Sequence, residues 1–167
     1  MAGEPGNFNG RSPESLEALP VYGEKGFCAI RKAGKTQRIE SRNISELRAF
    51  IEDAEIAWID YVVDDVEQDG YTAAASFGFS DLLIRNILKE ERTAYEDFDD
   101  ELGILIPAIF MQGFDVRLEP LFIFIKHNFI VTLHTREVKR FFRVRRYAET
   151  FLRKIPQSSL PGDKITH

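Results

Sequence analysis

The sequence predicts an α/β fold of three layers, α/β/α, in which helices cover both faces of a mixed sheet. Short apolar, β-branched segments alternate with segments of helical spacing, in the order β-β-α-β-α-α-β-β-β-β-α. This order combines one crossover region with a run of consecutive antiparallel hairpins. At 167 residues the chain is near the size of one domain. Its only cysteine, Cys28, cannot form an intramolecular disulfide and is predicted to be a small buried side chain.

The first elements are a hairpin and a helix. Residues 26–30 and 36–40 read as two strands, and Gly34 between them is free to adopt a positive φ. Residues 44–51 carry apolar side chains at helical spacing, with Asn43 or Ser45 as the N-cap.

A buried strand and two helices follow. Residues 56–63 are β-branched and aromatic, as in a strand covered on both faces. The acidic pair 64–65 then favours a helix N-terminus, and Gly78 is placed to end that helix. Ser80 caps the next predicted helix, residues 81–89.

Four consecutive strands are predicted at 93–98, 102–111, 116–126 and 129–134. The last three should pair as antiparallel neighbours, because short turns connect them and Asn128 tolerates a left-handed φ. A basic amphipathic helix is predicted from 138 to 155. Its apolar stripe is Phe141, Val144, Ala148, Phe151, Leu152 and Ile155.

Charge is unevenly distributed along the chain. Residues 1–116 hold 11 Lys and Arg against 23 Asp and Glu, whereas residues 117–167 hold 11 against 4. The basic end is therefore predicted either to face an acidic partner or to form a solvated helix face. Nucleic-acid binding is not expected, because Phe141, Phe151 and Tyr147 are assigned to the core side of the basic helix.

No secretory signal or membrane span is predicted within the sequence. The longest uncharged run, residues 102–114, has 13 residues, whereas a membrane helix needs about 20.

Catalytic signatures are missing, so no enzyme activity is predicted. His127 and His134 are one strand apart, and we expect turn and surface roles for them instead of a zinc site. Acidic residues gather at 60–69 and at 96–101. Solvated turns are the preferred interpretation, and a metal-dependent hydrolase that uses these carboxylates is the weakest alternative.

Five segments in register resemble the N-terminal cytoplasmic domain of CorA-type divalent-cation transporters. They are Trp58-Ile59-Asp60, the run from Phe77 to Leu88 (FGFSDLLIRNIL), Tyr95 to Asp100 (YEDFDD), Ile123 to Leu133 (IFIKHNFIVTL), and Val138 to Arg146. The resemblance covers residues 27 to 155 in the same order and with similar gaps. Its family fold is the α/β/α layering predicted above.

The resemblance implies a soluble, non-enzymatic regulatory domain of a pentameric Mg²⁺/Co²⁺ channel, at the cytoplasmic face of the cell membrane. It implies partners outside the sequence: a stalk helix, two membrane spans and four further subunits. The resemblance implies no tightly bound cofactor. It implies that Mg²⁺ or Co²⁺ is the transported or regulatory ion. The corresponding organisation is a disordered tail at 1–22, the domain at 23–156, and a tail or linker at 157–167.

Two positions depart from the family pattern. A consecutive Glu-Asp pair of the second short helix contributes to regulatory cation sites in the family, but here Arg85 and Asn86 occupy those positions. Arginine cannot bind a cation, so Asn86 is the remaining weak metal ligand and Arg85 becomes a candidate for the subunit interface. The alternative function is a free-standing soluble adaptor that binds an acidic partner through the basic helix.

Overall fold

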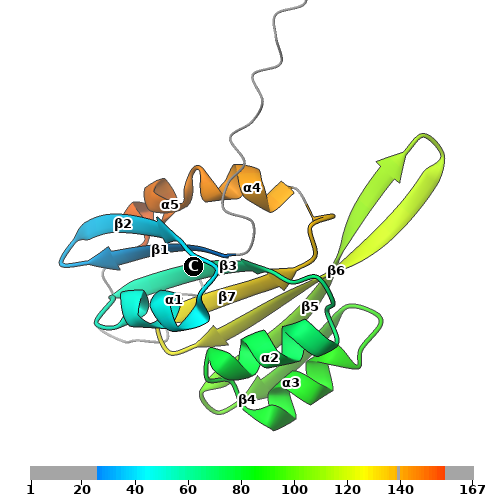
Figure 1. Ribbon diagram of the computed structural model, residues 1–167, viewed down its shortest axis with the longest axis horizontal. Coiled ribbons are helices and arrows are strands. Elements are labelled where there is room, and N and C mark those ends of the chain that lie inside the picture. Colours follow the sequence, from blue (N-terminus) through cyan, green and yellow to red (C-terminus); the bar gives the residue numbers. More distant parts are fainter. Residues whose placement is uncertain (1–25, 139, 157–167) are drawn as a thin grey trace, which may run out of the picture.

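The computed structural model describes residues 26–138 and 140–156, and it shows a seven-stranded sheet with helices on both faces (Figure 1). The strand order is β2-β1-β3-β7-β6-β5-β4. Only β3 and β7 pair in parallel, and the other neighbours in this sheet are antiparallel. The predicted mixed α/β/α fold is therefore confirmed. The tails predicted at 1–22 and 157–167 lie outside the described residues.

The strands are β1 (Gly26–Lys32), β2 (Lys35–Glu40), β3 (Ile56–Val62), β4 (Ala94–Phe98), β5 (Glu101–Gln112), β6 (Asp115–Lys126) and β7 (Phe129–His134). The helices are α1 (Ile44–Ile51), α2 (Gln68–Ser76), α3 (Asp81–Leu88), α4 (Arg140–Arg145) and α5 (Ala148–Lys154). None of the helices in the described ranges is long and apolar enough to span a membrane.

Local sequence signals set most of the element ends. Gly34 has φ +71° in the β1–β2 turn, and Gly78 has φ +94° just after α2, as predicted. The Asn43 side chain accepts a hydrogen bond from the amide of Ser45 and caps α1. Ser80 accepts one from the amide of Leu83 and caps α3.

The acidic pair 64–65 precedes a helix N-terminus, as predicted: α2 begins at Gln68, whose backbone amide donates to the Asp65 side chain at 2.9 Å. One local expectation was wrong. In the β6–β7 turn the left-handed residue is His127, with φ +51°, and not Asn128. The side-chain amide of Asn128 instead donates to the backbone carbonyl of Ala54, in the loop before β3.

The main core lies between the sheet and the layer of α1, α2 and α3. Cys28 is fully buried in it, as predicted, and burial raises the pKa of its thiol to about 12. Gly103 of β5 lets α3 approach closely. A Cβ at Gly103 would lie 2.7 Å from Cγ1 of Ile87 and 3.0 Å from Cδ1 of Leu83. Because Gly103 has no side chain, Ile87 and Leu83 of α3 pack directly against the backbone of β5.

The opposite face of the sheet carries α4 and α5, and here the prediction of one continuous helix from 138 to 155 was wrong. Helix α4 ends at Arg145, and Tyr147 leaves helical geometry with φ −104° and ψ 1°. Val144, Tyr147 and Phe151 are exposed instead of buried.

Among the side chains that the structure describes in these two helices, the buried ones are Arg145, Ala148 and Leu152. Ala148 and Leu152 belong to the predicted apolar stripe and are buried as predicted, whereas the burial of Arg145 was not predicted and is explained by its ion pair with Asp60 inside the sheet. The side chain of Phe141 lies outside those that the structure describes.

Candidate functional site

The start of α3 is held by a small polar cluster. One carboxylate oxygen of Glu101 accepts the amide of Ser80 at 2.9 Å, and the other lies 2.5 Å from the ammonium of Lys126. Lys126 also donates to the carbonyl of Gly78 at 3.0 Å. Burial raises the pKa of Glu101, but the hydrogen bonds from Lys126 and Ser80 outweigh it and hold the pKa below its usual range. The cluster ties the α2–α3 turn to strands β5 and β6.

Arg85 lies on the exposed surface of α3 and contacts its own helix. Its Nε lies 2.8 and 2.9 Å from the two carboxylate oxygens of Asp81, one turn earlier. The guanidinium carbon lies 5.2 Å from the centre of the Tyr71 ring, and the Tyr71 hydroxyl also donates to Asp81. Hydrogen bonds from Arg85 and then Tyr71 lower the pKa of Asp81. Whether Arg85 contacts a second subunit stays a prediction.

Asn86, the predicted weak cation ligand, points to β4. Its amide nitrogen donates to Glu96 at 3.4 Å, and its amide oxygen accepts from the ammonium of Lys89, also at 3.4 Å. The amide oxygen is the only side-chain atom of Asn86 that could bind a cation, and here it accepts from the ammonium of Lys89. Its role as a ligand stays a prediction.

No group of three or more His, Cys, Asp or Glu side chains that could hold a metal occurs within the described part of the chain. The two acidic segments at 60–69 and 96–101 therefore do not converge there. His127 lies 3.8 Å from Asp100, and both are exposed at neighbouring turns.

Sequence reasoning missed a buried ionic cluster beneath α4. Asp60 is completely buried, and its Oδ2 lies 2.5 Å from Nε of Arg145, which is 1% exposed. Its Oδ1 accepts from the hydroxyl of Thr132 at 2.6 Å and lies 2.9 Å from Nε2 of His134. The hydroxyl of Thr132 in turn accepts from the indole of Trp58 at 3.2 Å. Strands β3 and β7 and helix α4 meet at this one carboxylate.

The hydrogen bonding of this cluster indicates its charge state. Burial alone would raise the pKa of Asp60, but the hydrogen bond and charge of His134 and the charge of Arg145 lower it below its usual range. Asp60 is therefore ionised. Nδ1 of His134 lies 2.8 Å from the carbonyl oxygen of Thr135, so both ring nitrogens face acceptors. The His134 ring therefore links the Asp60 carboxylate to the backbone just after β7.

A second buried arginine holds the end of α5. Arg31 of β1 donates from Nη1 to the carbonyls of Leu152 and Ile155, at 2.8 and 2.7 Å. Its Nε lies 3.0 Å from Glu55. A cation at the C-terminal end of a helix satisfies carbonyls that lack partners within the helix. Together, Arg31 and Arg145 fasten α4 and α5 to the sheet.

The comparisons with known proteins agree with this geometry. The family model described as CorA-like Mg2+ transporter protein matches residues 53–162, which include Asp60, Arg85, Asn86 and Arg145. This chain belongs to that family. A search of curated proteins found no match to the chain.

Solved structures show the same fold as this CorA-like chain. The complete CorA magnesium transporter of Methanocaldococcus jannaschii is 20% identical over 83% of this chain, with a TM-score of 0.55. The soluble domain of that CorA is 21% identical over 77% (TM-score 0.52), and the ZntB cytoplasmic domain of Vibrio parahaemolyticus is 9% identical over 78% (TM-score 0.53). The alignments span 41%, 48% and 56% of those chains, so this CorA-like chain corresponds to about half of their length.

Several expectations about individual residues of the CorA-like chain require correction. His134 was predicted to lie at the surface, and Asp60 was grouped with a solvated acidic turn, but both are completely buried. One signal was present in the sequence: Trp58 and Asp60 alternate with Ile59, so they share one face of a strand whose other face is core. Nothing in the sequence distinguished Arg145, the partner of Asp60, from the basic residues around it.

Proposed function

We propose that this chain is the cytoplasmic regulatory region of a CorA-like divalent-cation transporter that carries Mg²⁺ or Co²⁺. The single observation that carries the proposal is the family match over residues 53–162 on a chain with the family's α/β/α fold. Its output is a conformational change, and it is not an enzyme. It works beside membrane and stalk regions, as one of five subunits at the cytoplasmic face of the cell membrane.

The buried contacts suggest how a conformational change would pass through the domain. Asp60 joins β3 and β7 to α4 through Arg145, and Arg31 joins β1 to the end of α5. A shift of the sheet therefore moves both helices with it. In this proposal α4 and α5 transmit the state of the sheet to the rest of the transporter.

The α3 surface supports a weak direct response to cations. Arg85 places a guanidinium where the family pattern has a carboxylate, and the oxygen of Asn86 already accepts from Lys89. A nearby cation repels Mg²⁺ and raises the cost of binding it. In this proposal Arg85 replaces a bridging cation by pairing with a carboxylate of the neighbouring subunit.

A transport assay tests this function. The complete reading frame that encodes this chain is expressed in cells that lack magnesium uptake, and growth on limiting Mg²⁺ and uptake of Co²⁺ are measured. We expect growth to be restored and Co²⁺ to accumulate. A protein that reaches the membrane but moves neither ion contradicts the proposal. The alternative adaptor function stays a prediction. Two observations count against it: α4 is short, and its Arg145 is buried and cannot face a partner.

A further inference from the structure

The outer face of α4 and α5 carries an exposed apolar stripe. Val144, Tyr147 and Phe151 are 38%, 53% and 52% exposed. The amide of Tyr147 donates to the carbonyl of Val144, and the amide of Phe151 to the carbonyl of Tyr147, so the three side chains follow one another along one side. The rings of Tyr147 and Phe151 are in contact, with centroids 6.5 Å apart. Ala148 and Leu152 pack toward the sheet, so this outer stripe faces away from it.

Basic side chains border the outer stripe. The exposed basic residues that the structure describes there are Arg143, Arg146, Arg153 and Lys154. Glu149 is the one carboxylate between positions 143 and 154, and it is directed to β2, where it lies 3.4 Å from Arg38. An apolar stripe with basic borders is complementary to a segment that carries apolar and acidic side chains.

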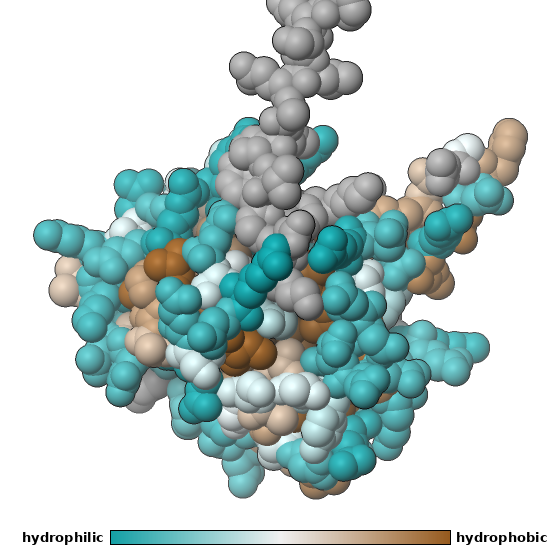
Figure 2. Space-filling model, viewed as in Figure 1, coloured by the Kyte–Doolittle hydropathy of each residue, from teal (hydrophilic) through white to brown (hydrophobic). Residues whose placement is uncertain are grey.

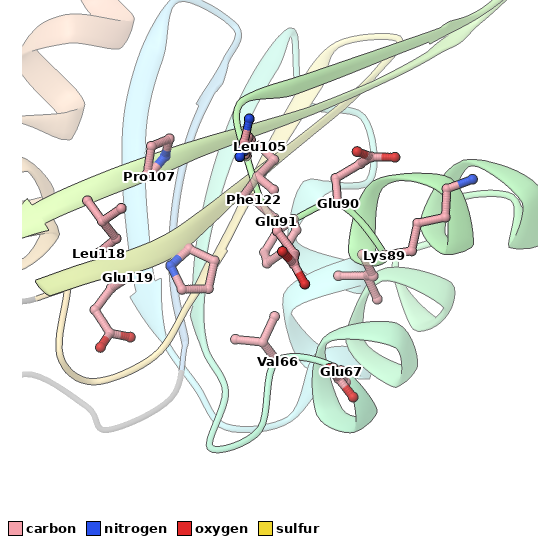
Figure 3. A pocket seen from close by; sticks show the side chains of 13 residues that line it. Val66, Glu67, Lys89, Glu90, Glu91, Leu105, Pro107, Leu118, Glu119 and Phe122 are labelled. Carbon is pink, nitrogen blue, oxygen red and sulfur yellow. The ribbon is translucent and has the colours of Figure 1, made fainter.

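A second exposed apolar surface, on the β5–β6 hairpin, has the opposite charge. Its end is hydrophobic (Figure 2), with Phe114 at the tip, but its charged residues are Asp115, Arg117 and Glu119. The notch at the base of the hairpin, about 380 Å³ in volume, is lined by four glutamates and two basic side chains (Figure 3). An acidic segment is therefore repelled by the hairpin and the notch and attracted by the outer stripe.

The chain itself contains a segment of this composition just before β1, residues 14–22. Its two charged residues, Glu14 and Glu17, are both acidic. Residues 1–25 together hold four acidic and two basic side chains, whereas residues 157–167, after α5, hold one of each. Charge therefore favours the segment before β1 over the segment after α5. The apolar residues of the favoured segment are Leu16, Ala18, Leu19, Pro20, Val21 and Tyr22.

This segment is tethered next to the outer stripe. Strand β1 begins at Gly26 and runs beside α5 (Figure 1), and Phe27 packs against Ala148 on the inner side of that helix. The guanidinium of Arg145 lies 5.6 Å from the centre of the Phe27 ring. A helix with its side chains is about 10–12 Å across, and four extended residues span about 14 Å. Residues 23–26 are therefore long enough to lead the segment around the helices to their outer face.

We propose that residues 14–22 bind the outer stripe of their own chain, with their leucines on Tyr147 and Phe151 and their glutamates beside the bordering basic side chains. The tether holds the segment at an effective concentration on the order of 1 mM, so a weak contact is enough to keep it bound. Composition alone predicted a disordered tail at 1–22. The outer stripe gives part of that tail a surface to bind.

Disulfide trapping within one chain tests this contact. The double variant Leu19→Cys, Phe151→Cys is oxidised mildly at low protein concentration, and the native Cys28 is buried with a pKa of about 12, so it does not compete. We expect an intrachain disulfide to form roughly tenfold faster than in the control Leu19→Cys, Leu82→Cys, because Leu82 is 58% exposed but lies on α3. Equal rates in the two variants, or a disulfide between two chains in place of one within the chain, overturn the proposal.

Amide NMR signals of the intact chain report the same contact without a cross-link. The variant Leu16→Ser, Leu19→Ser should shift the signals of the outer stripe and leave those of α3 unchanged, and so should Glu14→Lys, Glu17→Lys. Stripe signals that do not shift in either variant overturn the proposal. Stripe signals that respond equally in wild type and in Leu16→Ser, Leu19→Ser to vesicles of phosphatidylglycerol and phosphatidylcholine also overturn it, because an anionic membrane surface would then be the occupant.

Discussion

Two clusters in this molecule are built from the same three groups, a carboxylate, a guanidinium and an aromatic ring, but in opposite environments. The first is Asp60, Arg145 and Phe27, and the second is Asp81, Arg85 and Tyr71. The guanidinium lies 5.6 Å from the ring centre in the first and 5.2 Å in the second. In the first cluster the charged side chains are 1% and 0% exposed, and in the second 67% and 60%.

Burial decides what each cluster does. Inside the sheet, removal of one partner leaves a charge that water cannot solvate, so the cluster holds α4 in one position. On α3, water and salt screen the pair, so it contributes little to stability and remains available to other ligands. The comparison indicates that the buried cluster is structural, whereas the subunit contact proposed for Arg85 would be made on the exposed one.

The largest effect is expected from breaking the buried pair. Arg145→Met keeps a long apolar side chain but leaves Asp60 with one cationic partner fewer in a dry site. We expect a loss of about 3–5 kcal/mol in the free energy of unfolding, measured by urea denaturation. Arg143→Met, on the exposed side of the same helix, is the control and should stay within about 0.5 kcal/mol of wild type.

Acid should weaken the same cluster. The folded-state pKa of Asp60 lies below its unfolded value of about 3.9, so in acid the unfolded chain binds more protons than the folded one. The stability that Asp60 contributes is therefore complete above about pH 4 and is lost as pH falls through the folded-state pKa. Urea denaturation of wild type and Asp60→Asn across this range should show their difference shrinking toward low pH. A constant difference would mean that Asp60 is not ionised.

Removal of the exposed carboxylate should have a much smaller effect. Asp81→Asn breaks the contact with Arg85 on a solvated helix surface, and we expect no resolvable change in melting temperature. Thermal unfolding followed by circular dichroism checks this. A loss comparable to that of Arg145→Met would show that the two clusters are equivalent and that burial is not the deciding difference.

The smallest signal is expected from cation binding to the isolated chain. Calorimetric titration with Mg²⁺ and Co²⁺ should give little heat for wild type, since Arg85 repels cations and the Asn86 oxygen faces Lys89. The double variant Arg85→Glu, Asn86→Asp should gain binding. Tight saturable binding to wild type that survives Asn86→Ala would place the ion in the acidic turns instead.

Local signals predicted most of the fold. Asn43, Ser80 and Gly78 mark element ends through caps and positive φ, so the order of strands and helices followed from neighbouring residues alone. The two C-terminal helices could not be predicted this way. Ala148 and Leu152 are buried as the apolar stripe predicted, but the burial of Arg145 depends on Asp60, which lies 85 residues away in the sequence.

The same distinction applies to the candidate site: its residues could be identified from the sequence, but their contacts could not. Arg85 and Asn86 could be singled out because they depart from a family pattern at known positions. Their contacts with Asp81 and Lys89 depend on side-chain geometry at the helix surface, which periodicity does not specify. The β5–β6 hairpin was predicted as two strands, but its projection beyond the sheet depends on where β4 and β7 end.

One flux measurement tests the central claim most directly. The protein from the complete reading frame is reconstituted in vesicles, and divalent-cation flux is recorded while Mg²⁺ is raised on the side that holds this domain. The account predicts a flux that falls only slightly for wild type and strongly for Arg85→Glu, Asn86→Asp. Absence of any divalent flux, or inhibition of wild type as strong as that of the variant, would contradict the account.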